Sequence, residues 1–162
     1  MKKYLLFILL IAPSLVFGAS SSPQPEPDKP KAGVADYNEG CALLLKKEWP
    51  AAQSKFEAAL AADEKNAEAH NNLAYVLRKQ GEQNFAESLR QYNRALELKP
   101  KMAEAYMYRG ALHLFMGHKD LAQADLASLK KLHSKLAKEL EEVLETGKEE
   151  EPERFYGVSK KK

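Results

Sequence analysis

The stretch NNLAYVLRKQGEQNFAESLRQYNRALELKP, residues 71–100, decides the fold. Its apolar side chains recur three and four residues apart, as Leu73, Val76 and Leu77 do, which is the spacing of one helix face. Gly81 then ends a first helix, and Asn84 followed by Glu87 has the form of a capping box that starts a second. The stretch therefore predicts two helices joined by a short turn.

The same arrangement occurs three times, in copies that run 33–66, 67–102 and 103–136. Each copy has two small residues at matching places and a large side chain four residues after the second of them. The matching sets are Gly40, Ala74 and Gly110; Ala52, Ser88 and Ala122; and Phe56, Tyr92 and Leu126. Helices are expected near 35–47, 50–62, 67–80, 84–98, 103–116 and 119–132, and no run alternates long enough to predict a strand.

The pattern resembles the tetratricopeptide repeat, a helix–turn–helix unit of 34 residues. The middle copy matches best, with Tyr92, Ala95 and the closing Pro100 at the family's places. The resemblance implies an all-α, right-handed solenoid of three such repeats, the domain spanning 33–146. A further amphipathic helix at 135–146 carries Leu136, Leu140 and Val143 on one stripe and is expected to cap the open end of the stack.

The N-terminus has the layout of a secretory signal peptide over residues 1–18. Lys2 and Lys3 precede an apolar run that Pro13 interrupts, and this run is shorter than a spanning helix requires. Cleavage is expected after Gly18, Ala19 or Ser20, which predicts a periplasmic or secreted protein that meets the membrane only before cleavage.

The two segments that flank the domain differ from it in composition. Residues 19–32 are rich in Pro and Ser and are expected to form a disordered spacer, and the charged tail 147–162 is also expected to be disordered. Phe155 and Tyr156 are unusual in such a tail. They either dock back on the domain or meet a partner, and the sequence does not distinguish the two.

Charge and residue content exclude several classes of function. The chain of 162 residues has 25 Lys and Arg and 23 Asp and Glu. Lys2 and Lys3 lie in the leader, so the mature chain is balanced, which argues against a nucleic-acid partner. Cys41 is the only cysteine, and the four histidines, His70, His113, His118 and His133, have no metal-ligand spacing. The sequence thus predicts no catalytic residue, no metal site and no cofactor.

The resemblance implies that a peptide would bind to the concave side, which the first helix of each repeat lines. Carried onto this sequence, the family's contact places give the predicted binding residues Tyr37, Cys41, Asn71, Tyr75, Arg78, Lys79, Met107 and Phe115. Among these, Asn71 could bond to a peptide backbone, and Arg78 or Lys79 could meet an acidic group.

Some cytosolic members of the family clamp a C-terminal carboxylate with Lys, Asn and Arg at five fixed places. Here those places hold Tyr37, Cys41, Asn72, Glu104 and Tyr108. Only the Asn matches, so this form of carboxylate clamp is not predicted.

The leading hypothesis is a non-enzymatic scaffold or adaptor of the cell envelope that holds a protein or peptide on its concave face. The alternative is a self-assembling structural oligomer, joined through the solenoid ends or the cap helix.

Overall fold

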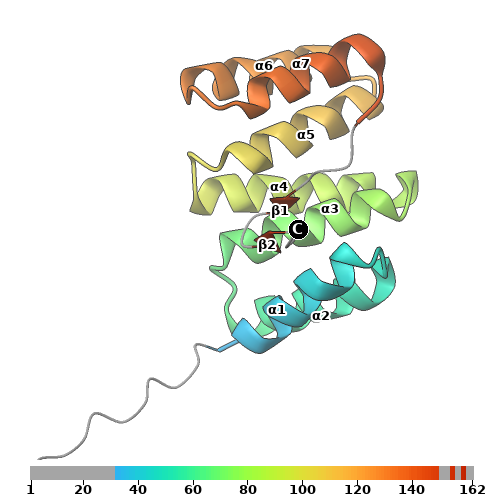
Figure 1. Ribbon diagram of the computed structural model, residues 1–162, viewed down its shortest axis with the longest axis vertical. Coiled ribbons are helices and arrows are strands. Elements are labelled where there is room, and N and C mark those ends of the chain that lie inside the picture. The colour runs from blue at the N-terminus through green and yellow to red at the C-terminus, as the bar shows by residue number, and fades with distance from the viewer. Residues whose placement is uncertain (1–31, 150–153, 156–157, 160–162) are drawn as a thin grey trace, which may run out of the picture.

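The computed structural model describes residues 32–149, 154–155 and 158–159 of the chain. Within these residues it contains seven α-helices, one short 3-10 helix and two dipeptide strands (Figure 1). The helices are α1 (Val34–Leu45), α2 (Trp49–Ala62), α3 (Ala67–Lys79), η1 (Glu82–Asn84), α4 (Phe85–Leu98), α5 (Ala103–Phe115), α6 (Lys119–Lys131) and α7 (Leu136–Thr146). The strands β1 (Arg154–Phe155) and β2 (Val158–Ser159) pair antiparallel. All seven expected helices are present, and each end lies within two residues of its expected place.

The helices form antiparallel pairs that stack into one column. Helix α1 packs on α2, α3 on α4 and α5 on α6, and each pair contacts the next through α2 with α3 and α4 with α5. Figure 1 shows the column with α1 and α2 at one end and α6 and α7 at the other. This confirms the predicted solenoid of helix–turn–helix repeats. The cap is confirmed as well, because α7 packs on both α5 and α6.

Local chemistry explains three of the helix ends. Pro50 lies in the first turn of α2, where its missing N–H has no helical partner to lose. Asn66 caps α3 by accepting a hydrogen bond from the Ala69 N–H at 2.9 Å. Gly147 ends α7 in the left-handed conformation, at φ 67°, and its N–H donates to the Val143 carbonyl.

The expected capping box at Asn84 is wrong. The Asn84 side chain makes no capping hydrogen bond, and α4 instead continues from the 3-10 turn η1. The Asn84 backbone is itself near-helical, at φ −99° and ψ −1°, whereas a capping residue normally has extended backbone.

The small residues of the repeat let helices approach closely. A Cβ atom at Gly40 would lie 2.8 Å from Cε1 of Phe56, so the ring fills the space that the missing side chain leaves. A Cβ at Gly110 would lie 2.6 Å from a methyl carbon of Leu140, so this glycine makes room for the cap helix. Phe56, Tyr92 and Leu126 are all buried, as the matching places in the three copies predict.

One buried ion pair ties the last repeat together. Arg109 on α5 donates two hydrogen bonds to Asp125 on α6, at 3.0 and 2.6 Å, and a third to Asn93 on α4 at 2.7 Å. Asp125 is almost fully buried, and the two parallel bonds satisfy both of its oxygens. None of the helices in the described part of the chain has the length and apolar character needed to cross a membrane.

We expect Gly40→Ala to lower the free energy of unfolding of the mature chain by up to about 2 kcal/mol. Alanine favours a helix by about 1 kcal/mol over glycine, but overpacking a buried contact costs about 1–3 kcal/mol. The measurement is urea unfolding followed by circular dichroism. In a Phe56→Leu background the same substitution should cost less, because the ring that it meets is gone. Equal costs in the two backgrounds would contradict the close contact.

Candidate functional site

The eight residues predicted to bind a peptide lie on three helices that contact one another in succession. Helix α3 packs on α1 and on α5, and α5 in turn packs on α7. We call the side of the column formed by α1, α3 and α5 the inner face. Tyr37 and Cys41 lie on α1, four residues lie on α3, and Met107 and Phe115 lie on α5.

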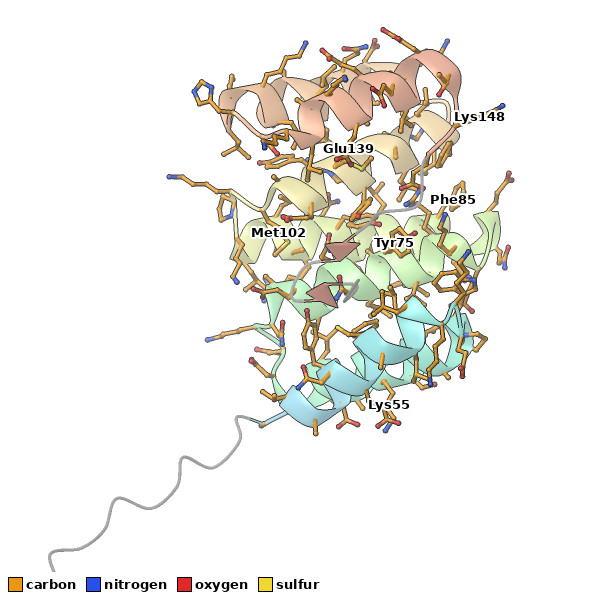
Figure 2. The ribbon with its side chains drawn as sticks, in the orientation of Figure 1. Lys55, Tyr75, Phe85, Met102, Glu139 and Lys148 are labelled. Atoms are coloured by element: carbon orange, nitrogen blue, oxygen red, sulfur yellow. The ribbon has the colours of Figure 1, made fainter. Side chains whose placement is uncertain are left out.

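Four of the predicted residues are too buried to offer much surface to a partner. Cys41, Asn71, Tyr75 and Met107 are all at most 3% exposed. The Tyr75 ring meets the edges of Trp49 and Tyr108, with centroids 6.3 and 5.2 Å apart, and Figure 2 shows it in the middle of the column. These side chains pack in the core between repeats, because successive first helices are close enough for their facing side chains to interlock.

The remaining predicted residues keep more surface or carry charge. Phe115 is 39% exposed, and Tyr37 and Lys79 are half-buried. Arg78 is buried and forms the charged centre of the inner face.

A small polar cluster joins α1 to α3. The Asn72 amide donates to the Tyr37 hydroxyl at 3.3 Å and to Cys41 Sγ at 3.6 Å. Burial raises the pKa of the Cys41 thiol to about 11, and it also raises the pKa of Tyr37. Both groups therefore stay neutral at physiological pH, and the cluster joins the first two repeats without presenting a reactive thiolate.

The guanidinium of Arg78 lies among aromatic rings. Its central carbon is 5.2 Å from the ring centroid of Tyr75, 5.9 Å from that of Tyr108 and 5.7 Å from that of Phe115. Aromatic faces attract a cation, and the attraction grows when water is excluded. The rings thus hold the guanidinium in place between α3 and α5.

The partner of Arg78 is a carboxylate 71 residues further along the chain. Arg78 Nη1 donates to Glu149 Oε2 at 2.8 Å, and Nη2 donates to Oε1 at 2.7 Å. The two side chains are 3% and 4% exposed, and Lys79 Nζ lies 3.7 Å from the same carboxylate. Burial opposes the charge of Arg78, but Tyr92 and Glu149 outweigh it, so the pKa of Arg78 is raised.

One buried polar atom of Arg78 is unpaired at this site. Within the described residues, the buried Arg78 Nε has no hydrogen-bond partner. Such groups are costly to bury unless something satisfies them. The Arg78 region therefore keeps hydrogen-bonding capacity beyond what Glu149 uses.

The sequence indicated that Arg78 and Lys79 could bind an acidic group, but it did not indicate that the Glu149 carboxylate is that group. The tail 147–162 is expected from sequence to be disordered, yet residues 148 and 149 run back to α3, and β1 and β2 form a strand pair. The signal was the run of glutamates after Lys148, which complements the basic pair, but only the fold brings the two together. Phe155 lies in β1, but its side chain and Tyr156 lie outside the described residues. That these two residues either dock back on the domain or meet a partner therefore stays a prediction.

The histidines serve as packing and hydrogen-bonding groups. His70 contacts Gln91 Oε1 at 2.6 Å and the Glu64 carbonyl at 3.0 Å. His113 is buried, which lowers its pKa, and its ring lies 6.0 Å from that of His118. Among the residues that the structure describes, no group of three His, Cys, Asp or Glu side chains is placed to hold a metal ion.

The family model described as "Tetratricopeptide repeat" matches residues 37–83 and 82–124, more than half of the chain. The chain belongs to the tetratricopeptide-repeat family. These matches fall on the first two predicted copies and most of the third. A comparison of the sequence with curated proteins gives no significant match.

Solved structures of tetratricopeptide-repeat domains have the same fold. The yeast Sti1 TPR2B domain, in a complex with pHsp70, is 19% identical with a TM-score of 0.65, over 70% of this chain and 93% of that one. The Arabidopsis OM64 domain is 23% identical with a TM-score of 0.64, over 72% and 97%. The second domain of Spaghetti (RPAP3), bound to the HSP90 peptide SRMEEVD, is 22% identical with a TM-score of 0.58, over 62% and 91%. At these identities the likeness shows the fold alone.

We expect the Cys41 thiol to react with a disulfide reagent at pH 8 about 100-fold more slowly in the folded chain than in the chain unfolded by concentrated guanidinium. Burial excludes the reagent from the folded chain, and the raised pKa of the thiol lowers the fraction of reactive thiolate. The measurement is the release of the coloured thiol product, and Cys41 is the only cysteine that can contribute. Equal rates in the folded and unfolded chain would show that Cys41 is open on the inner face.

Proposed function

We propose that this tetratricopeptide-repeat protein is an exported, non-enzymatic scaffold that binds a protein or peptide on its inner face in the cell envelope. The observation that carries the proposal is the Arg78 site. A guanidinium held among three aromatic rings grips a carboxylate with two parallel hydrogen bonds, next to the half-buried Lys79 and the exposed Phe115. Buried arginine and aromatic side chains are the residues that dominate binding energy at protein interfaces.

The relatives support a peptide as the kind of partner. One of them is bound to an HSP90 peptide that ends in EEVD, and another is in a complex with pHsp70. The inner face here differs from the cytosolic carboxylate clamp. The Asn72 amide already donates its hydrogen bonds to Tyr37 and Cys41, and the charged centre lies at Arg78. The proposed partner is therefore an acidic protein segment of the envelope rather than a nucleic acid.

A photo-crosslinking residue in place of Phe115 tests this function in cells. Phe115 is an exposed apolar residue at the Arg78 site, and Leu121 on α6, which is 50% exposed, is a matched position on a second helix of a pair. We expect a discrete adduct with another protein from position 115 and none from 121. The adduct should weaken several-fold when Arg78→Lys is added, because lysine lacks the planar fork that grips a carboxylate.

Other crosslinking results would argue against the scaffold. Adducts with only a second copy of the chain would favour the alternative of a self-assembling oligomer. The same adducts from 115 and 121, unchanged by Arg78→Lys, would place the interaction elsewhere.

Export is tested by the N-terminus of the purified protein. In a bacterial host the full-length chain should be recovered from the periplasm or the medium, starting at residue 19, 20 or 21, because the leader has the layout of a cleaved signal peptide. Intact-mass spectrometry gives the cut site, and a Lys2→Glu and Lys3→Glu variant should accumulate uncut in the cytosol. A full-length chain that keeps Met1 and stays in the cytosol would contradict export.

A further inference from the structure

We propose that Arg78 is the centre of a carboxylate-binding site, and that the chain's own C-terminal segment fills this site through Glu149 until an acidic partner displaces it. The inference rests on the proposed function, because it concerns the same inner face. It adds the chemistry of the ligand and an internal competitor for it.

The contact between Glu149 and Arg78 differs from the surface ion pairs of this protein. Lys130 with Glu141 and Arg94 with Glu97 are substantially exposed, and pairs of that kind contribute little because water screens them. Arg78 and Glu149 are both almost fully buried and bond through two N–H groups. A carboxylate that has left water needs such a receptor, since an unpaired buried charge is strongly destabilising.

The receptor is built by the solenoid and not by the tail. Arg78 is fixed on α3, and its rings come from α3 and α5, namely Tyr75, Tyr108 and Phe115. Lys79 adds a second positive charge 3.7 Å from the carboxylate. None of these groups belongs to the tail, so the same receptor can take a carboxylate from another source.

The position of the cap helix places Glu149 next to Arg78. Leu140 and Val143 bury α7 against the rest of the domain, and Gly147 then turns the chain out of the helix. Glu149 follows only two residues later, and Figure 2 shows Lys148 where the chain leaves α7. A ligand on so short a connection has a high effective concentration, so it competes strongly with a partner from solution.

The charges of the segment and of the site are complementary. Glu149 stands in the run Lys148-Glu149-Glu150-Glu151, and the site presents Arg78 beside Lys79. A partner that takes the place of Glu149 must bring a carboxylate of its own. Arg78 Nε, which has no partner among the described residues, gives that carboxylate a further hydrogen bond to accept.

The test measures binding of a labelled synthetic peptide, GKEEEPERFYGVSKKK (residues 147–162), to the mature full-length chain by fluorescence anisotropy. The chain is compared as wild type, as Glu149→Gln and as Glu145→Gln. Glu145 is an exposed carboxylate four residues earlier, so its variant makes the same charge change without touching Arg78. We expect Glu149→Gln to bind the peptide at least about 10-fold more tightly than the other two, because its own tail no longer fills the site.

Two further arms show that the gain comes from the carboxylate site. A peptide with Gln in place of Glu149 should bind the Glu149→Gln chain at least about 10-fold more weakly than the native peptide. Adding Arg78→Lys to the chain should remove the gain, because lysine cannot form two parallel bonds. Thermal melting by circular dichroism checks that each variant is folded, and the peptide arm decides the outcome if Arg78→Lys does not fold.

Several results would overturn the inference. One is equal binding of the native peptide by all three chains, and another is no binding by any of them up to millimolar peptide. A concentration-dependent dimer that Glu149→Gln abolishes would also overturn it, since Glu149 would then come from a second copy. Failure of the crosslinking test alone would argue against an outside partner and leave the internal contact standing, so the two proposals fail separately.

Discussion

A pair of helices in this chain can bury its apolar side only against the next pair, and the rest of the structure depends on this constraint. The pairs stack closely because small residues remove side chains at the crossing points. The Phe56 ring occupies the space over Gly40, and Leu140 of the cap helix occupies the space over Gly110. The cap helix follows from the same constraint. Without α7, the last pair of helices would expose the apolar side of α5 and α6 on which α7 packs.

Stacking also explains how a charge comes to be buried on the inner face. Bringing α3 against α5 places Arg78 among Tyr75, Tyr108 and Phe115 and removes most of its water. Burial alone would disfavour the guanidinium, so the fold requires a negative partner there. Glu149 meets the requirement from within the chain, and the proposed exchange rests on the same requirement, which only another carboxylate would meet.

The buried charged and hydrogen-bonded clusters among the described residues include two kinds. The Arg109–Asp125 pair and the Asn72 cluster are closed, because their members are satisfied by fixed neighbours on packed helices. Arg78 is satisfied by a residue that lies beyond the last helix and is held by a short connection. An ion pair of the first kind stabilises the column, whereas the second kind is the one for which we propose an exchange of partner.

The sequence by itself determined the repeat, all seven helices to within two residues, and the burial of Phe56, Tyr92 and Leu126, because these follow from local spacing and small-residue positions. It also marked the inner face and the basic pair Arg78–Lys79. It did not determine which inner-face residues stay open, since the burial of Cys41, Asn71, Tyr75 and Met107 depends on how closely successive repeats approach. Nor could it pair Arg78 with Glu149: the two are 71 residues apart, and only the packing of α7 on α5 brings that carboxylate to α3.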